Sequence, residues 1–438
     1  MSAYLDLLMF AAACLVLLMG FPVAFTLAGV ALAFGLIGQG LDIFDMGFFY
    51  ALPQRIFGTM TNEVLIAVPL FVFMGTMLER ARVAEDLLEN MSRLFAGVRG
   101  GLGISVSIVG ALLAASTGIV GATVVTMSLL SLPTMLRRGY APSLAAGSIA
   151  AAGTLGQIIP PSIVLVLLGD VIANAYQKAQ LEQGIFAPET VSVGELFSGS
   201  LIPGLVLVGL YIVYQVGLAI FKPSMAPPAG YDDDLVLSDL LGALFAPVFL
   251  IISVLGSILA GIATPTEAAA VGAVGTILLA GHKLGDRQKL MAAGALAVIL
   301  VVAFASTFDL RLERDNIAVP DLLAIGVALT LCGVIVAAVG ASLLTAYRLG
   351  VLESTMRSTT HTTSMVFVIL IGAALFSLVF RGLGGDDHVL SVPQLSIYFL
   401  DAVVEDFIHK ASRITSMGRA VRFAQKSRAL GLGTMGLH

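Results

Sequence analysis

One stretch of the sequence sets hydroxyl side chains beside backbone that cannot continue a regular helix. Residues 153–162 read GTLGQIIPPS, inside an apolar run that could otherwise cross a bilayer as one helix. Each proline of the pair lacks an amide hydrogen and clashes with the preceding turn. Unwound backbone and opposed half-helix ends bind ions and anionic solutes in secondary transporters. The alternative is a plain proline kink that neighbouring helices satisfy. The candidate binding residues are Gly153, Thr154, Gly156, Pro160, Pro161 and Ser162.

A second group of hydroxyl and glycine residues lies in the middle of residues 101–136. Two short apolar limbs meet there at AASTGIVGAT. This pattern predicts a re-entrant hairpin, whose non-helical tip must lie against protein or a wet cavity. The alternative is two ordinary spans joined by a tight turn. The candidate tip residues are Ser116, Thr117, Gly118, Gly121 and Thr123.

A third interruption falls within SILAGIATPTEAAAVGAVG at residues 257–275. Pro265 and Glu267 are typical of the first turn of a helix, where proline is tolerated and a carboxylate complements the positive end of the helix. An ionisable residue within a membrane span is also a functional candidate. Thr264, Thr266 and Glu267 are therefore either part of a proton or sodium path or the beginning of a helix near the interface, and both interpretations stay open.

The composition places these residues in a membrane. Hydrophobic residues make up 58% of the chain and charged residues 12%, and the mean hydropathy is +1.00. Apolar runs of helical length recur, which predicts an all-α polytopic membrane protein that crosses a lipid bilayer several times. The net charge of −5 provides no basic patch for nucleic acid. Cys14 and Cys332 lie in apolar runs without a partner spacing, so we expect buried free thiols.

Basic residues give a provisional orientation. Arginines cluster after the apolar run that ends near Leu78 and again after residue 136, and basic loops favour the cytoplasmic side of a membrane. Both stretches are therefore predicted to be cytoplasmic, so residues 101–136 would enter and leave on one side. The arginines are Arg80, Arg82, Arg93, Arg99, Arg137 and Arg138.

Four of these motifs together resemble a known family. AVPLFVFMG at 67–75, ASTGIVGAT, AAGTLGQIIPPSIVLVLLGD and GIATPTEAAAVGAVG occur in the order found in the large membrane (permease) subunit of tripartite ATP-independent periplasmic (TRAP) transporters. The resemblance covers residues 1 to about 388. It implies an elevator-type fold with inverted repeats, a re-entrant hairpin and discontinuous helices in a bacterial inner (cytoplasmic) membrane.

The resemblance also implies an activity and partners. Members of the family carry out sodium-coupled uptake of organic acids, with a small membrane subunit and a periplasmic solute-binding protein. By family position, Ser116, Thr117, Gly118 and Thr123 match the first hairpin tip, and Gly153 to Ser162 match the discontinuous helix. Sodium, the coupling ion, is then expected near Ser116 and Gly153, and no other cofactor is expected.

The predicted organisation divides the chain into five parts. Residues 1–100 hold the N-terminal membrane helices and an amphipathic arm, and residues 101–173 hold the first hairpin and broken helix, which form half of a transport domain. Residues 174–261 supply scaffold helices. Residues 262–388 begin a second repeat and include an extra helix pair at about 291–344. Residues 391–438 form a foreign, non-membrane tail.

The tail departs from the family. Where a second hairpin and a second broken helix would follow, the chain reads YFLDAVVEDFIHKA and then RAVRFAQKSRALGLGTMGLH. These segments resemble an internal piece of the large chain of class I ribonucleotide reductase. The chemistry of that family depends on cysteines and the tail has none, so no reductase activity is inferred. The second repeat is therefore expected to be truncated, which leaves the activity of the chain open.

The function predicted from the sequence is that of a secondary active transporter permease subunit. The expected substrate is an organic acid, of C4-dicarboxylate or sugar-acid type. The alternative is a channel or membrane scaffold subunit without transport activity. An enzyme is not expected, because the sequence has no HExxH or GxSxG motif and its histidines fall in loops, at segment ends or in the tail; these are His282, His361, His388, His409 and His438.

Overall fold

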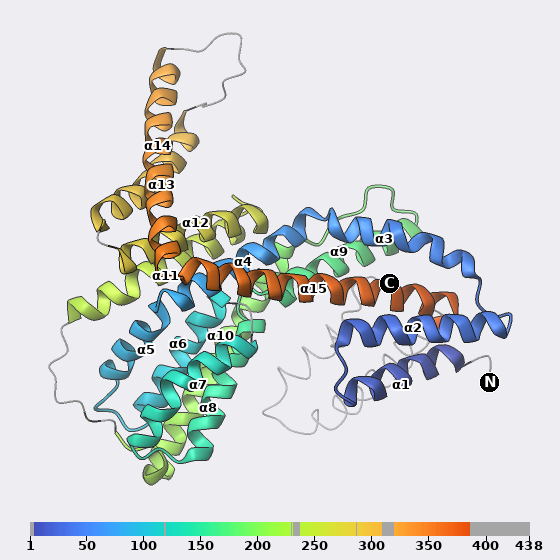
Figure 1. Ribbon diagram of the computed structural model, residues 1–438. Coiled ribbons are helices and arrows are strands. Elements are labelled where there is room, and N and C mark those ends of the chain that lie inside the picture. The colour runs from blue at the N-terminus through green and yellow to red at the C-terminus, as the bar shows by residue number, and fades with distance from the viewer. Residues whose placement is uncertain are drawn as a thin grey trace, which may run out of the picture. The chain divides into compact units, whose positions relative to one another are not determined.

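The computed structural model describes residues 4–117, 120–228, 230, 237–285, 287–308 and 319–385. The predicted tail at 391–438 and the tip residue Gly118 lie outside these residues. The described part of the chain is helical and contains no strand, which confirms the all-α fold class. In chain order the α-helices and 3-10 helices are α1 (Leu5–Leu18), α2 (Val23–Gly40), η2 (Met46–Ala51), α3 (Leu52–Met60), η3 (Glu63–Ile66), α4 (Ala67–Arg80), α5 (Val83–Leu94), α6 (Gly101–Thr117), α7 (Val120–Arg137), α8 (Pro142–Thr154), η4 (Leu155–Gln157), α9 (Ile163–Glu182), α10 (Val193–Phe221), η5 (Pro223–Met225), α11 (Leu237–Leu259), α12 (Pro265–Leu284), α13 (Gln288–Thr307), α14 (Val319–Arg348) and α15 (Val351–Gly382) (Figure 1).

Several of these helices are long and apolar enough to cross a bilayer. Among the described residues five satisfy that test, or up to six if Met46–Met60 and Glu63–Arg80 form one broken span. This supports a protein that crosses the membrane several times. The five are Val23–Gly40, Val193–Phe221, Gln288–Ala305, Leu323–Arg348 and Val351–Gly382.

The chain forms two compact units. Of the described residues, those before Asn62 and those after Ser364 form one unit, and those from Asn62 to Ser364 form the other. In the first unit, buried side chains of α1, of α2 and the segment after it, and of the C-terminal end of α15 and the residue after it form one cluster; they are Leu5, Met9, Ala31, Phe44, Leu375, Val379 and Leu383. The sequence GFP at residues 20–22 lies between α1 and α2.

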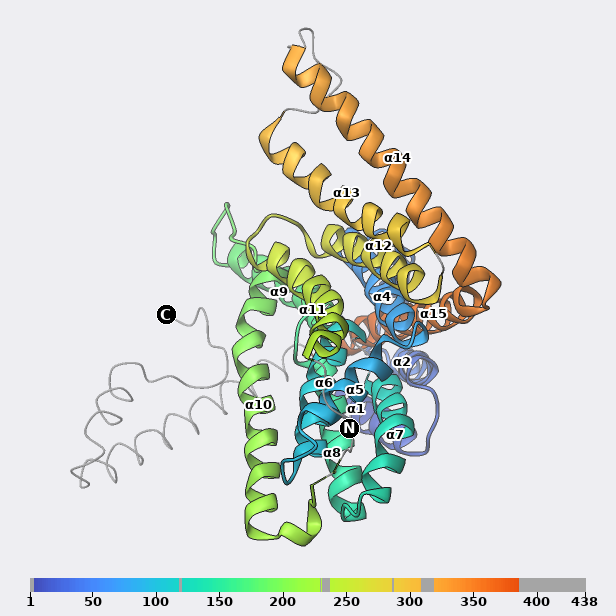
Figure 2. The same ribbon diagram turned by 90° about the vertical axis from the view of Figure 1, so that its left-hand side faces the viewer.

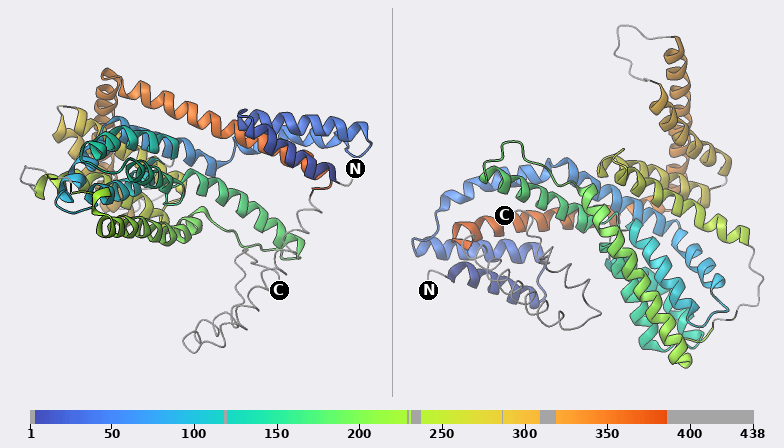
Figure 3. Two further views of the ribbon diagram at one scale, coloured as in Figure 1. Left: turned by 90° about the horizontal axis from the view of Figure 1, so that it is seen from below. Right: turned by 180° about the vertical axis from the view of Figure 1, so that it is seen from behind.

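The second unit contains the residues singled out by the sequence. Its helices α6, α7 and α8 pack against one another, and α10 runs alongside them (Figure 3, right). The apolar pair predicted at about 291–344 forms α13 and α14, which lie side by side (Figure 2). Helix α12 packs on α4, α11, α13 and α14. The largest buried cluster of the unit includes side chains of α4, α5, α6, α7 and α8.

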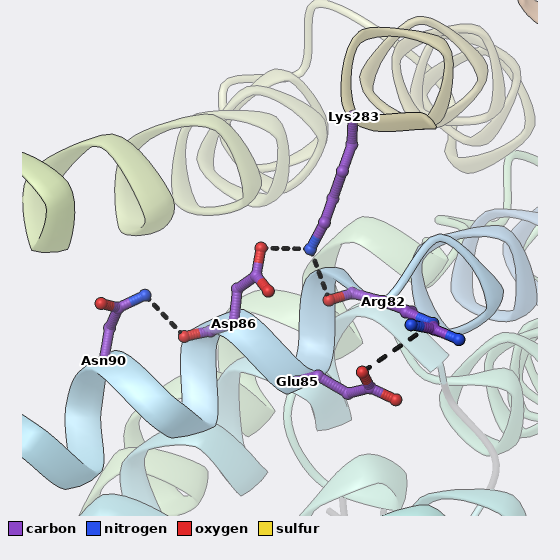
Figure 4. Close-up of polar contacts among 5 residues, drawn as sticks. All are labelled: Arg82, Glu85, Asp86, Asn90 and Lys283. Atoms are coloured by element: carbon purple, nitrogen blue, oxygen red, sulfur yellow. Dashed lines mark hydrogen bonds and ion pairs between the residues drawn. The ribbon is translucent and has the colours of Figure 1, made fainter. Parts of the chain in front are cut away.

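Helix α5 is amphipathic and lies within residues 1–100, where the sequence predicts an amphipathic arm. Its apolar face is buried through Leu87, Leu88 and Met91, whereas Asp86 and its acidic neighbours point outward. The first turn of α5 is tied to the end of α12. Lys283 forms an ion pair with Asp86 and donates a hydrogen bond to the carbonyl oxygen of Arg82 at 2.7 Å (Figure 4).

A buried amide joins α10 to α6. Gln215 Nε2 donates to Ser107 Oγ at 2.7 Å, and both residues are buried. A Cβ atom at Gly103 would lie 1.6 Å from Gln215 Oε1, so this side chain needs a glycine beside it. Buried polar groups are costly unless they are hydrogen-bonded, so this pair fixes the register of the two helices.

The expectation of buried cysteines is wrong in one respect. Cys14 and Cys332 are free thiols, as expected, but both are exposed on the surfaces of α1 and α14. These helices are apolar around most of their circumference, and lipid tails solvate an apolar helix surface as well as protein does. An apolar run in a membrane protein therefore does not predict that its residues are inside the protein.

Candidate functional site

The helix containing the proline pair is interrupted, as the sequence predicts. Helix α8 ends at Thr154, the short 3-10 helix η4 follows, and α9 begins at Ile163. Gly156, Pro160 and Pro161 are buried in this break, and the Pro160–Pro161 peptide bond is cis. The break therefore lies inside protein, where non-helical backbone at membrane depth is tolerated.

Ser162 joins the two sides of the break. Its hydroxyl donates to the carbonyl oxygen of Gln157 at 2.9 Å and accepts a hydrogen bond from the amide of Leu165 at 3.4 Å. The residue is fully buried. One hydroxyl thus serves as the N-cap of α9 and as the partner of a carbonyl at the end of η4.

The break lies against the helical hairpin. A Cβ atom at Gly153 would lie 2.2 Å from Val124 Cγ2, so the end of α8 touches the first turns of α7. A Cβ atom at Gly110 would lie 2.7 Å from the Cβ of Ala152, which places α8 equally close to α6. Small residues permit this approach of three helices, as is common in membranes. The structure therefore brings together two of the groups predicted from the sequence.

The remaining residues of these two groups differ in their surroundings. Thr154 is exposed, and its hydroxyl donates to the carbonyl oxygen of Ala151 at 2.7 Å. Thr123 is buried in α7. Ser116 and Thr117 belong to the last turn of α6, and Gly121 belongs to the first turn of α7.

The third group lies at the start of α12 and forms a helix cap. Thr264 and Glu267 make a capping box: Glu267 Oε2 accepts from the amide of Thr264 at 2.8 Å, and Thr264 Oγ1 accepts from the amide of Glu267 at 3.3 Å. Both residues are exposed. Thr266 donates to the carbonyl oxygen of Glu63 at 3.0 Å, which ties α12 to η3 at the start of α4.

We expect the change Glu267→Gln to leave stability and any transport activity close to those of the unchanged chain. Glutamine can fill the same position of a capping box while removing the negative charge. Thr264→Ala, by contrast, removes the cap and is expected to cost about 1 kcal/mol. Thermal unfolding and sodium-dependent uptake measured on both variants test this. Loss of uptake in Glu267→Gln with unchanged unfolding would assign the carboxylate to the ion path instead.

Two polar contacts near the site were not predicted from the sequence. Thr126 Oγ1 donates to Glu79 Oε1 at 2.6 Å, which joins the hairpin helix α7 to the end of α4. Asn62 Nδ2 donates to Asp170 Oδ1 at 2.9 Å, which joins η3 to α9. The carboxylates of Glu79 and Asp170 lie in or next to apolar runs, which is the signal that could have identified them. Their partners, Thr126 and Asn62, are far away in the sequence, so the sequence could not have identified the two pairs.

The described residues contain no group of three or more His, Cys, Asp or Glu side chains that could hold a metal ion. The polar groups at the break are hydroxyls, the side-chain amide of Gln157, backbone amides and backbone carbonyls. Together these features define a class: a multi-pass, all-α membrane protein in which a helical hairpin packs on an interrupted helix.

The comparison with known families gives the particular membership. The family model described as "Tripartite ATP-independent periplasmic transporter, DctM component" matches residues 9–293, and the chain belongs to this family. This confirms the resemblance inferred from the four motifs. The likeness of residues 391–438 to ribonucleotide reductase is not addressed by this match and stays a prediction.

Several curated proteins are similar to the chain. The C4-dicarboxylate TRAP transporter large permease protein DctM of Pseudomonas aeruginosa is 31% identical over 277 residues, which cover 61% of this chain and 60% of that protein. The ectoine TRAP transporter large permease protein TeaC of Halomonas elongata is 27% identical over 321 residues, with coverages of 71% and 69%. The sialic acid TRAP transporter large permease protein SiaM of Vibrio cholerae is 30% identical over 263 residues, with coverages of 59% and 55%.

These relatives are named as permease proteins and not as enzymes, which confirms that prediction. The match to the first of them spans 60% of its length.

Proposed function

We propose that the chain is the large permease subunit of a secondary transporter that receives its substrate from a periplasmic binding protein. The observation that carries the proposal is the contact between the interrupted helix and the hairpin at Gly153 and Val124. Membership of the family and the names of the relatives support it. A small membrane subunit is the second partner, and the bacterial inner membrane is the location.

The proposed substrate is an organic acid and the proposed coupling ion is sodium. The relatives are named for C4-dicarboxylate, ectoine and sialic acid, so the site in this fold accepts more than one kind of solute across the family. Backbone carbonyls and hydroxyls around Ser116, Gly153 and Ser162 would supply oxygen to sodium. Amide groups at the beginnings of α7 and α9 would favour the anion.

The proposed mechanism moves the hairpin and the broken helix as one body. Helices α6, α7 and α8 touch through small residues at Gly110 and Gly153, so they cannot slide past one another without losing contact. Residues 196–261 would supply part of the scaffold. Substrate and sodium would favour the movement only through their different affinities for the two positions of that body.

The test is uptake of labelled organic acids into proteoliposomes that contain this chain and the small subunit, with the binding protein outside. We expect uptake that requires a sodium gradient and the binding protein and that is absent with potassium. Substitution of Thr154 or Ser116 is then expected to reduce it. Flux that needs neither sodium nor the binding protein would indicate a channel, and no flux with all three components would indicate a scaffold.

A further inference from the structure

A second polar region lies at the opposite end of α7 from the break. An open cavity of about 660 Å³ is lined by residues of α5, α6 and α7, a volume within the range of small-molecule sites. Its floor is apolar and is formed by Leu88, Leu102, Val106, Leu130 and Met135. Hydroxyl and charged side chains line the rest, so the cavity is suited to a ligand with a polar head and an apolar body.

The charged groups of the cavity come from two helices and have opposite signs. Helix α5 contributes the carboxylates of Glu85 and Glu89, and α7 contributes the guanidinium groups of Arg137 and Arg138. Arg93 pairs with Glu89 at 2.6 Å, so Glu85 is the carboxylate better able to accept a ligand cation. The contact of Glu85 with Arg82 is long, at 4.0 Å, and about half of the Glu85 side chain is exposed (Figure 4).

The arginines differ in how they are held. Arg138 Nη1 donates to the carbonyl oxygen of Gly230 at 2.8 Å, which anchors it to the chain. Arg137 is held through Nε, which donates to the carbonyl oxygen of Pro133 at 3.3 Å. The Nη groups of Arg137 thus remain positioned to contact an anion, and guanidinium binds phosphate with two parallel hydrogen bonds.

A buried hydroxyl in the same lining supports a ligand. Ser131 lines the cavity and is 3% exposed, and its Oγ atom has no hydrogen-bond partner within the described part of the chain. A buried hydroxyl without a partner is costly, so such a group calls for an explanation, and an absent ligand oxygen is one. Ser131 belongs to α7, as do Leu130 of the apolar floor and Arg137.

The level of the cavity in the membrane indicates which ligand it is. The stretches that hold Arg82 and Arg137 are predicted to be cytoplasmic from their basic residues, and they meet at this cavity. A cavity between these stretches is therefore expected to lie at the headgroups of the cytoplasmic leaflet, where basic side chains bind lipid head groups. The paired opposite charges further select a head that carries both a phosphate and a cation.

We propose that this cavity binds a phospholipid whose head carries a primary ammonium beside its phosphate, as in phosphatidylethanolamine. The phosphate contacts Arg137 and Ser131, the ammonium contacts Glu85, and the glycerol and upper acyl chain lie on the apolar floor. The bound lipid fastens α5 to the base of the hairpin. This site is separate from the substrate site at the break.

The experiment measures lipid binding to the delipidated full chain in detergent by native mass spectrometry. The probes are phosphatidylethanolamine, phosphatidylglycerol, phosphatidylcholine and soluble phosphoethanolamine. We expect phosphatidylethanolamine to bind about tenfold more tightly than each of the other three, which corresponds to roughly 1.4 kcal/mol. Equal or tighter binding of phosphatidylglycerol overturns the ammonium contact. If phosphoethanolamine binds as tightly as phosphatidylethanolamine, the cavity is a site for a soluble zwitterion and the lipid proposal is contradicted.

Matched variants assign the contacts. Arg137→Gln is expected to weaken binding of both phosphatidylethanolamine and phosphatidylglycerol about tenfold. Glu85→Gln is expected to weaken phosphatidylethanolamine alone and so abolish the preference. The control is Arg348→Gln, which changes another arginine in the last turn of a helix, outside the cavity. An equal loss in Arg348→Gln, or an unchanged preference in Glu85→Gln, contradicts the proposal, and the selectivity of the unchanged chain tests it if a variant fails to fold.

Discussion

Replacing Gly153 with alanine is expected to abolish uptake and lower the temperature of unfolding, whereas Gly147→Ala on the same helix is expected to do neither. A Cβ atom at position 153 would lie 2.2 Å from Val124 Cγ2 and 3.2 Å from Val124 Cα, while a Cβ atom at position 147 would meet nothing within 4 Å. Valine on a helix has one strongly preferred rotamer, so its side chain cannot turn away. Helices α7 and α8 must therefore separate.

This overpacking is expected to lower the free energy of unfolding by about 1–3 kcal/mol. A cost of that size changes the equilibrium between the packed and the displaced hairpin by about tenfold or more, since about 1.4 kcal/mol corresponds to a factor of ten. The second change Val124→Ala in the same chain should restore both unfolding temperature and uptake, because it removes the atoms that collide. If Gly153→Ala is as active and as stable as Gly147→Ala, the close packing described here does not exist in the working protein.

Ser162→Ala is expected to have the second largest effect. The change removes the N-cap of α9, which is expected to lower the free energy of unfolding by about 1 kcal/mol. It also leaves the part-buried carbonyl of Gln157 without this hydrogen bond, a loss of up to about 1–3 kcal/mol more. The break would lose a side chain that joins its two sides, so uptake is expected to fall with stability. Thermal unfolding and sodium-driven uptake measure the two effects.

The control for this variant is Ser192→Ala. Ser192 is the N-cap of α10 and forms a capping box with Glu195, at an exposed position. Loss of the Ser192 hydroxyl is expected to lower the free energy of unfolding by about 1 kcal/mol and to leave the break unchanged. Should both serine variants lose the same stability and both keep uptake, the hydroxyl of Ser162 is only a helix cap and has no part in the binding site.

Local features of the fold could be predicted because their causes are local. A proline pair cannot continue a regular helix, and Pro160 and Pro161 lie in the interruption between Thr154 and Ile163. The sequence T-P-T-E at 264–267 has the spacing of a capping box, and Thr264 and Glu267 form one. In each case the signal and the structure lie within a few residues of one another.

Features that depend on contacts between distant residues could not be predicted. The hydrogen bond from Gln215 to Ser107 joins residues more than a hundred positions apart, and nothing in either segment names the other. The mixed-charge cavity lined by Arg137 is formed by residues of three helices, α5, α6 and α7. The exposure of Cys14 was mispredicted for a related reason, since an apolar run shows that a residue avoids water but not whether it faces lipid or protein.

The contact between Gly153 and Val124 also constrains how this chain can diverge. Because the two residues fill one shared volume, a larger residue at position 153 is tolerated only after position 124 has become smaller. The same holds for Gly103 and Gln215, where an added methyl group would occupy the place of the amide. Substitutions at such positions are expected to occur in pairs. In a large alignment of permeases, a larger residue at position 153 should therefore accompany a smaller residue at position 124, even where the substrate differs.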